Sequence, residues 1–166
     1  KSAGSNIIGG IRNIFIGDAA GLINTSGNYN TIVGYNGLRQ NATGAANTAI
    51  GSLSLENHTA SAGNTALGYQ SLRYLTTGQY NIAIGYFAGL KKVATGNLTN
   101  ASYGIYLGYA VDGTEGASGE IVIGKDAQGL GSNTTRLGGS NITKTVIEYG
   151  NVGIGTTSAD LKLHIN

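Results

Sequence analysis

The stretch N-T-A-I-G at residues 47–51 recurs as N-T-A-L-G at residues 64–68 and as N-I-A-I-G at residues 81–85. The same pattern precedes it as N-T-I-V-G at residues 30–34 and N-I-F-I-G at residues 13–17. The period is 17 residues each time, and a constant period of this length is typical of a stacked repeat fold. Farther along the chain the spacing becomes irregular, but the glycine that ends each five-residue pattern is still present. The nine glycines are Gly17, Gly34, Gly51, Gly68, Gly85, Gly108, Gly124, Gly138 and Gly155. The sequence therefore predicts nine coils of one repeated unit.

Each unit begins with a short strand. The residue before the glycine is aliphatic, and the residue two places earlier is mostly β-branched, which favours an extended chain. Because side chains alternate across a strand, these two columns share one face, which we expect to fill the coil interior. A leucine four or five residues after the glycine predicts a second, weaker strand. These leucines are Leu22, Leu38, Leu55, Leu72 and Leu90. The predicted fold is all-β, a β-solenoid or β-roll with coils of about 17 residues and almost no helix.

The middle residue of each strand is predicted to lie on the opposite face, away from the coil interior. This column reads Phe15, Ile32, Ala49, Ala66, Ala83, Tyr106 and Val122. A continuous apolar stripe of this length exceeds what a soluble monomer normally exposes. We therefore predict that the column forms an interface between chains of an oligomer.

The composition excludes several classes of protein. The chain has 166 residues, of which 29 are glycine, and it contains no proline, cysteine, methionine or tryptophan. Charged residues make up 11% of the chain, against about 25% in an ordinary domain. The net charge of +2 indicates no nucleic-acid interface, and the absence of cysteine excludes disulfides and thiolate metal sites. No apolar run reaches the roughly 18 residues of a membrane span, so no membrane insertion is expected.

Few residues point to catalysis. The stretch G-E-I-V-I-G-K-D at residues 119–126 lacks the Ser or Thr that a phosphate-binding loop needs after its lysine, and it is in register with the strands. His58 and His164 lie far apart, and His58 is expected on the surface. An acidic cluster could serve glycoside hydrolysis or bind calcium, but solvated turn residues are the expected interpretation. The cluster comprises Asp112, Glu115, Glu120 and Asp126. We expect no enzyme, no metal and no cofactor.

Repeated polar and aromatic residues are better candidates for function. A tyrosine directly follows four of the nine repeated glycines, which we call the rung glycines, so stacking of the coils places these tyrosines in one column. They are Tyr35, Tyr69, Tyr86 and Tyr109. Such a column either docks the sugar rings of a receptor or fills space at a corner between chains. Two irregular segments, residues 96–103 and 112–119, interrupt the period and are candidate binding loops.

Asparagine and threonine form two further columns. The asparagines that open the strands are expected to form an amide ladder along the rod. They are Asn13, Asn30, Asn47, Asn64 and Asn81. Thr31, Thr48 and Thr65 could form the flat array of an ice-binding solenoid, but they share a face with the aliphatic column and are expected inside the coil.

The N-T-A-I-G and Y-Q-S-L units, with T-T-G-Q-Y-N between them, resemble the glycine-rich repeats of bacteriophage tail-fibre proteins. They are also similar to the head domains of trimeric autotransporter adhesins. Residues 150–166 resemble the stretch before the self-cleaving intramolecular chaperone of many tail fibres, with Ala159 where proline is usual. The resemblance implies a repetitive region over residues 1–138 and a C-terminal β segment over residues 139–166 that leads toward a missing chaperone.

The resemblance further implies a homotrimer on an extracellular fibre of the virion that binds a host-surface glycan or protein. Three alternatives remain open at this point. They are a bacterial trimeric adhesin head, an ice-binding β-solenoid, and a capsule depolymerase that uses Glu115 and Glu120.

Overall fold

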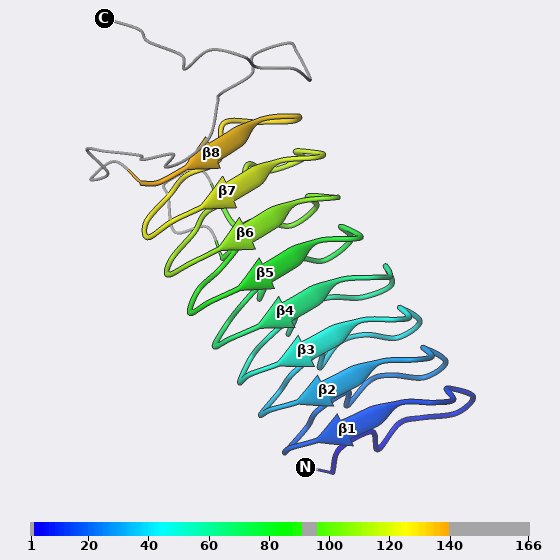
Figure 1. The fold of residues 1–166 in the computed structure, drawn as a ribbon. Helices are drawn as coiled ribbons and strands as arrows, with labels where there is room; N and C mark the ends of the chain where they lie inside the picture. Colours follow the sequence, from blue (N-terminus) through cyan, green and yellow to red (C-terminus); the bar gives the residue numbers. More distant parts are fainter. Residues whose placement is uncertain (1, 91–95, 140–166) are drawn as a thin grey trace, which may run out of the picture.

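The computed structural model describes residues 2–90 and 96–139, which form a β-solenoid of about 17-residue coils (Figure 1). Each coil contributes one three-residue strand, and the eight strands form a single parallel sheet in chain order. The strands are β1 (Ile14–Ile16), β2 (Thr31–Val33), β3 (Thr48–Ile50), β4 (Thr65–Leu67), β5 (Ile82–Ile84), β6 (Ile105–Leu107), β7 (Ile121–Ile123) and β8 (Thr135–Leu137). The predicted solenoid is thus confirmed, and the ninth predicted rung lies outside the described residues.

The register of the sheet follows the repeat. Thr48 of β3 pairs with Thr31 of β2 and Thr65 of β4, so equivalent residues lie directly above one another. The six-residue insertion after β5 does not disturb this, because Ala83 of β5 still pairs with Tyr106 of β6. The chain therefore forms columns of equivalent residues along the axis of the rod.

The two faces of the strands are the reverse of those predicted. The middle column lies inside the coil: Ile32, Ala49, Ala66, Ala83, Tyr106 and Val122 are completely buried, and Phe15 is half-buried. The flanking columns point outward, with Ile50 37% and Leu67 42% exposed. The seven middle residues thus line the interior of one chain rather than an interface between chains. The coil is narrow, and alanine fits there opposite the buried leucines of the second half of each unit.

The second half of each unit turns without forming a strand in any of the described coils. Leu38, Leu55 and Leu72 are buried as expected, but their φ angles are between 44° and 49°, in the left-handed region. Backbone hydrogen bonds still join neighbouring coils here, for example from Leu55 N to Ser71 O at 3.0 Å. The alternation of left-handed and ordinary residues curves the chain back toward the next strand.

The glycine after each strand is required by the stacking. Gly51 has a φ of 130°, a conformation that side chains rarely adopt. A Cβ atom at Gly51 would overlap the carbonyl oxygen of Gly68 in the next coil. Equivalent overlaps occur along the column, so this position admits only glycine.

The asparagine ladder forms as predicted. Asn64 donates from its backbone N–H and from Nδ2 to Asn47 Oδ1, at 3.0 and 3.2 Å, and its Nδ2 also donates to Gly78 O at 3.0 Å. Asn81 repeats the first two contacts on Asn64 Oδ1, both at 3.0 Å. All five side chains except Asn13 are completely buried. The ladder therefore satisfies the buried backbone groups where each strand begins.

The six extra residues between β5 and β6, predicted within the irregular segment at residues 96–103, lie earlier in the chain. Thr76 N donates to Thr99 O and Asn81 Nδ2 to Ala101 O, so residues 98–103 continue the regular columns. The extra residues therefore precede Leu98, and residues 91–95 among them lie outside the described ranges, as does the predicted C-terminal segment from residue 140 onward. No helix among the described residues is long and apolar enough to cross a membrane.

Candidate functional site

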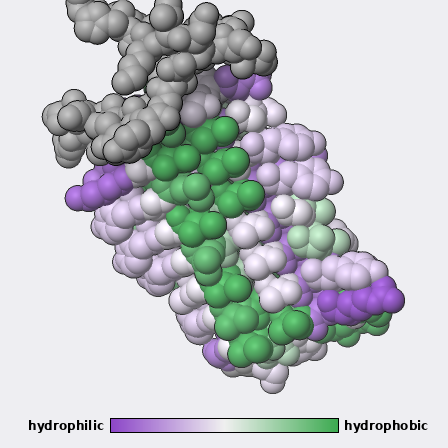
Figure 2. Space-filling view, in the orientation of Figure 1, coloured by the Kyte–Doolittle hydropathy of each residue, from purple (hydrophilic) through white to green (hydrophobic). Residues whose placement is uncertain are grey.

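The outward face of the sheet is an exposed apolar surface. It consists of the first and last residues of every strand, and Figure 2 shows a hydrophobic band running along the stacked coils. Exposed fractions on this face reach 58% at Ile16 and 57% at Leu137. Four of the eight coils also place a threonine in the first column, at Thr31, Thr48, Thr65 and Thr135. A stripe of this kind is typical of a surface that another molecule covers.

A tyrosine column runs along the end of the strands, as predicted. The rings of Tyr69 and Tyr86 stack with centroids 5.0 Å apart, and those of Tyr86 and Tyr109 with centroids 5.6 Å apart. Phe87 packs against Tyr86 with a centroid distance of 4.1 Å. Tyr35 stands apart, because Ser52 occupies the same position in the coil between it and Tyr69. The ring faces of Tyr69, Tyr86 and Tyr109 pack on one another, and the hydroxyl group of Tyr69 accepts a hydrogen bond from Gln70 Nε2 at 2.8 Å.

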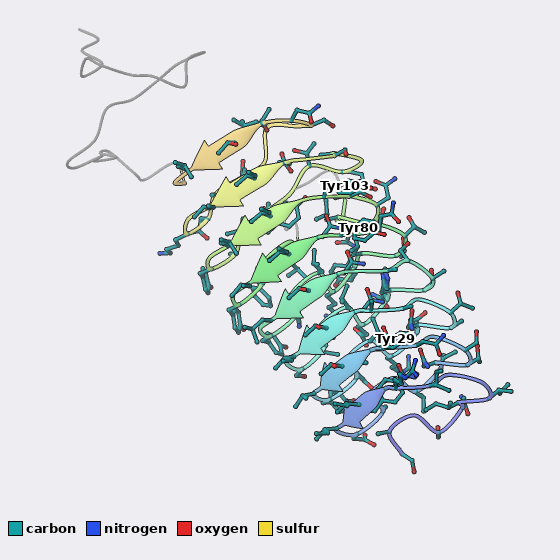
Figure 3. All side chains as sticks on the ribbon, turned by 45° about the vertical axis from the view of Figure 1, so that its right-hand side comes forward. Tyr29, Tyr80 and Tyr103 are labelled. Atoms are coloured by element: carbon teal, nitrogen blue, oxygen red, sulfur yellow. The ribbon has the colours of Figure 1, made fainter. Side chains whose placement is uncertain are left out.

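A second tyrosine column, which the sequence analysis missed, precedes the strands (Figure 3). Tyr80 and Tyr103 stack with centroids 5.3 Å apart, and Arg12 lies 5.2 Å from the centroid of Tyr29. All three tyrosines are more than half exposed and have φ angles of 56° to 58°. The available signal was their common position two residues before a strand triplet. Tyrosines therefore border the outward face at both ends of the strands.

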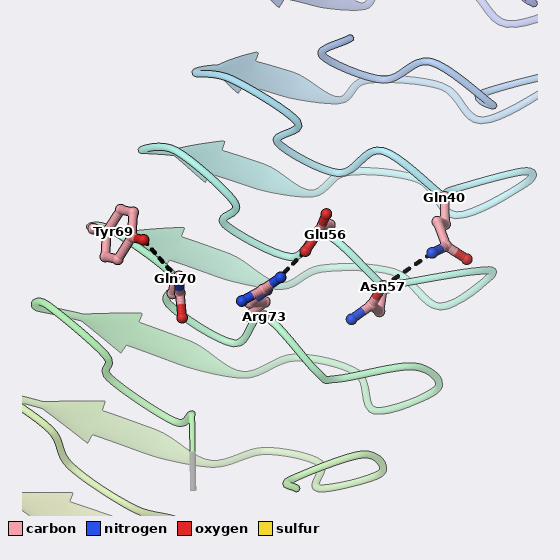
Figure 4. A network of polar contacts seen from close by, with 6 residues as sticks. All are labelled: Gln40, Glu56, Asn57, Tyr69, Gln70 and Arg73. Carbon is pink, nitrogen blue, oxygen red and sulfur yellow. Dashed lines mark hydrogen bonds and ion pairs between the residues drawn. The ribbon is translucent and has the colours of Figure 1, made fainter. Parts of the chain in front are cut away.

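The side of the coil away from the strands carries a polar network (Figure 4). We define the back face as Arg39, Gln40, Glu56, Asn57, Arg73 and Tyr74. Arg73 Nε donates to Glu56 Oε2 at 2.7 Å, and Gln40 Nε2 donates to Asn57 Oδ1 at 3.0 Å. Each pair spans one coil, so equivalent planar groups lie in two rows along the rod.

The predicted acidic cluster does not form one solvated group. Glu120 is completely buried, and Asp112 is 8% exposed, whereas Glu115 and Asp126 are exposed. Glu120 accepts hydrogen bonds from Thr114 N, Thr114 Oγ1 and Gly131 N at 2.8 to 2.9 Å. Glu120 occupies the position that asparagine holds in the ladder, and the signal was its place directly before the strand triplet of β7. Glu120 and Glu115, the two carboxylates of the depolymerase alternative, therefore lie in different environments, one buried and one exposed.

Tyr106 fills the coil interior beside this carboxylate. Burial, with smaller contributions from the charges of Glu120 and Glu115, raises the pKa of Tyr106 well above its usual value. The phenol oxygen is buried and has no hydrogen-bond partner among the described residues. A Cβ atom at Gly104 or Gly113 would collide with the ring, so both glycines make room for it.

His58 is buried, and its expected surface position is wrong. It continues an interior column that begins with Asn24 and Asn41, each one coil apart. His58 Nε2 lies 2.9 Å from Ser61 O and therefore donates to it, which leaves Nδ1 as an acceptor without a partner among the described residues. Burial lowers the pKa of His58, against smaller opposing effects of backbone contacts with Ser61 and Leu75.

The described residues contain no group of three or more His, Cys, Asp or Glu side chains that could hold a metal ion. Comparison of the chain with protein-family models, with curated proteins and with solved structures yields no match. The functional argument therefore depends on the surfaces described above.

Proposed function

We propose that this chain is a structural and adhesive segment of a homotrimeric fibre, of the bacteriophage tail-fibre or trimeric adhesin kind, that contacts a cell surface. The observation that carries the proposal is the continuous outward face of the sheet. Its exposed aliphatic side chains lie in straight columns about 34 Å long, seven steps of ~4.8 Å, which suits a parallel copy of the same column. The trimeric state itself comes from the resemblance of the repeats.

The outward face replaces the middle column as the proposed interface. Packing three sheets around one axis would cover the aliphatic columns and leave the back faces pointing outward. The tyrosine columns then border the interface, where their apolar rings and polar hydroxyl groups suit a rim. Three copies of one weak site on a rigid rod would bind a cell surface with the avidity of multivalent contact.

The molar mass in dilute solution tests the proposal. Light scattering after size exclusion is expected to give three times the chain mass of 16.8 kDa. Ile50→Lys on the outward face, where Ile50 is 37% exposed, should dissociate the trimer. Ile23→Lys is the matched control, because Ile23 is 38% exposed but lies on the other side of the coil. A monomeric wild-type chain, or equal dissociation by both variants, would refute the proposed interface.

Ice binding is a second candidate, which the exposure of the outward face favours. Thr31, Thr48 and Thr65 stand one coil apart beside Val33, Ile50 and Leu67, and all six lie on this face rather than inside the coil. Rows of hydroxyl and methyl groups at a regular ~4.8 Å step can order water. This candidate requires a monomer that shows thermal hysteresis, whereas the fibre segment requires a trimer without it.

A further inference from the structure

We infer that the back face binds a linear acidic polysaccharide that lies along the rod, with Arg39 holding a sugar carboxylate. The inference rests on the proposed adhesive function and names its ligand class and its site. The back face is distinct from both tyrosine columns. It is also the surface that would remain uncovered if the outward faces meet at a three-fold axis.

The chemistry of the back face suits sugars. Its side chains end in guanidinium, carboxylate, amide and phenol groups, which offer several donors and acceptors in a plane for vicinal hydroxyl groups. Glu56 and Arg73 are held against each other at 2.7 Å, with side-chain exposures of 13% and 26%. Gln40 and Asn57 are likewise joined at 3.0 Å. Because these contacts hold the groups in place before binding, little side-chain entropy is lost when a ligand arrives.

The spacing of the rows favours a polymer. Arg39, Glu56 and Arg73 follow one another at one-coil intervals, and so do Gln40, Asn57 and Tyr74. Neighbouring coils are ~4.8 Å apart, close to the length of one pyranose unit in an extended chain. Successive sugars of a polysaccharide parallel to the rod therefore meet successive rows of the back face.

The charges of the back face favour an acidic ligand. Two guanidinium groups and one carboxylate leave a net charge of +1, and Glu56 pairs with Arg73. Arg39 has no ion-pair or hydrogen-bond partner for its side chain among the described residues, and it is half-buried at the same time. A carboxylate on the sugar supplies the bidentate partner that a guanidinium group prefers.

Oligogalacturonate, with a carboxylate on every sugar, is a suitable probe, and its methyl ester is a matched neutral probe. Amide chemical shifts of the labelled chain, or of its trimer, are followed during titration with each. We expect oligogalacturonate to move the signals of residues 39–40, 56–57 and 73–74, and the ester to bind at least about tenfold more weakly. No shifts at millimolar probe, equal binding of the ester, or shifts confined to the tyrosine columns would overturn the inference.

Two variants separate recognition from folding. Arg39→Gln should weaken binding about tenfold, while Arg12→Gln, an arginine outside the back face, should leave it unchanged. Glu56→Gln should strengthen binding about threefold at low salt, because it removes the competing carboxylate beside Arg73. A structural role for Glu56 alone would weaken binding instead, and that result would contradict the inference. The same samples report their molar mass, so a trimer that ignores the probe overturns only the polysaccharide site, and a monomer overturns the fibre.

Discussion

The first five coils and the last three solve the same packing problem in different ways. In the coils of β1 to β5, asparagine precedes every strand, and each amide is satisfied by the equivalent residue one coil away. In the coils of β6 to β8 the residue directly before the strand is Gly104, Glu120 and Thr134, respectively. There the buried groups find individual partners, and Tyr106 has none for its hydroxyl group. The comparison shows that repetition satisfies buried polar groups with one residue type, whereas each departure from it needs a local solution.

A substitution in the asparagine ladder should reduce the free energy of unfolding more than any other change considered below. Asn64→Ala removes the Nδ2 group that donates to Asn47 Oδ1 and Gly78 O, and the oxygen that accepts from Asn81. Asn81 N then has no acceptor, and Asn81 Nδ2 keeps only Ala101 O. We expect a loss of about 3 to 5 kcal/mol in the free energy of unfolding, measured by urea denaturation. Asn57→Ala is the control: it loses one half-buried hydrogen bond from Gln40 and should cost less than about 1 kcal/mol. Equal costs would mean that the ladder adds nothing beyond ordinary surface contacts.

A substitution at Glu120, whose hydrogen bonds replace those of the ladder, should cause the next largest loss in the free energy of unfolding. Glu120→Gln places an amide NH₂ group against one of two backbone donors, Thr114 N or Gly131 N, because each carboxylate oxygen accepts one of them. The expected loss is about 2 kcal/mol by the same denaturation measurement. Glu115→Gln, at an exposed carboxylate, should cost less. A more stable Glu120→Gln protein would show instead that desolvation of the buried charge outweighs its hydrogen bonds.

The interior column that contains His58 predicts a pH effect of intermediate size. Because burial lowers the pKa of His58, the unfolded chain takes up a proton more readily than the folded one. The contribution of the neutral His58 side chain to stability should therefore be fully present above the unfolded pKa of 6.5, and it should be lost as the pH falls through the lower pKa of the folded state. His58→Asn continues the column of Asn24 and Asn41 and should remove this acid sensitivity. Thermal unfolding at pH 7.5 and pH 5 compares the two proteins, and parallel losses in both would contradict the prediction.

Tyr106→Phe should have the smallest effect at neutral pH, and in the opposite direction. Removing a buried hydroxyl group without a partner should leave stability unchanged or raise it by about 1 kcal/mol. The pKa of Tyr106 is raised in the folded state, so the folded chain holds this proton more tightly than the unfolded chain. The proton-linked part of the free energy of unfolding is therefore fully present below pH 10 and is lost as the pH rises further. The variant should lose less stability than the wild type between pH 9 and pH 11. Marked destabilisation at neutral pH would show that the phenol oxygen has a partner.

The repeat predicted the strands and their register, but it did not predict which face of each strand is inside. All eight predicted triplets within the described residues form strands, because the period aligns equivalent residues. Both faces of these strands are apolar, so alternation alone could not distinguish them. Size was the overlooked signal, since Ala49, Ala66 and Ala83 fit a narrow interior that isoleucine at every position would overfill.

Site residues were predictable only where they share a column. The stacked tyrosines after the strands followed from the period, and the burial of His58 could have followed from its spacing to Asn24 and Asn41. The back face was not predicted, because Arg39, Glu56 and Arg73 stand one coil apart but differ in residue type, so their column shows no repeated residue. The side of the coil on which this column lies depends on the left-handed turns of the second half-coil, which carry no strand pattern.

The glycine column has a consequence for how such a rod changes over evolution. From Gly17 to Gly85, a Cβ atom at each of these glycines would meet chiefly the backbone of the equivalent glycine one coil on, so these coils present similar upper and lower surfaces to their neighbours. Within these coils, duplicating or deleting one 17-residue unit therefore requires no compensating change in the neighbouring units, whereas a single substitution at one of the glycines disturbs two coils at once. The length of the rod can vary in whole coils, and each added coil moves a surface site one step of ~4.8 Å along the axis.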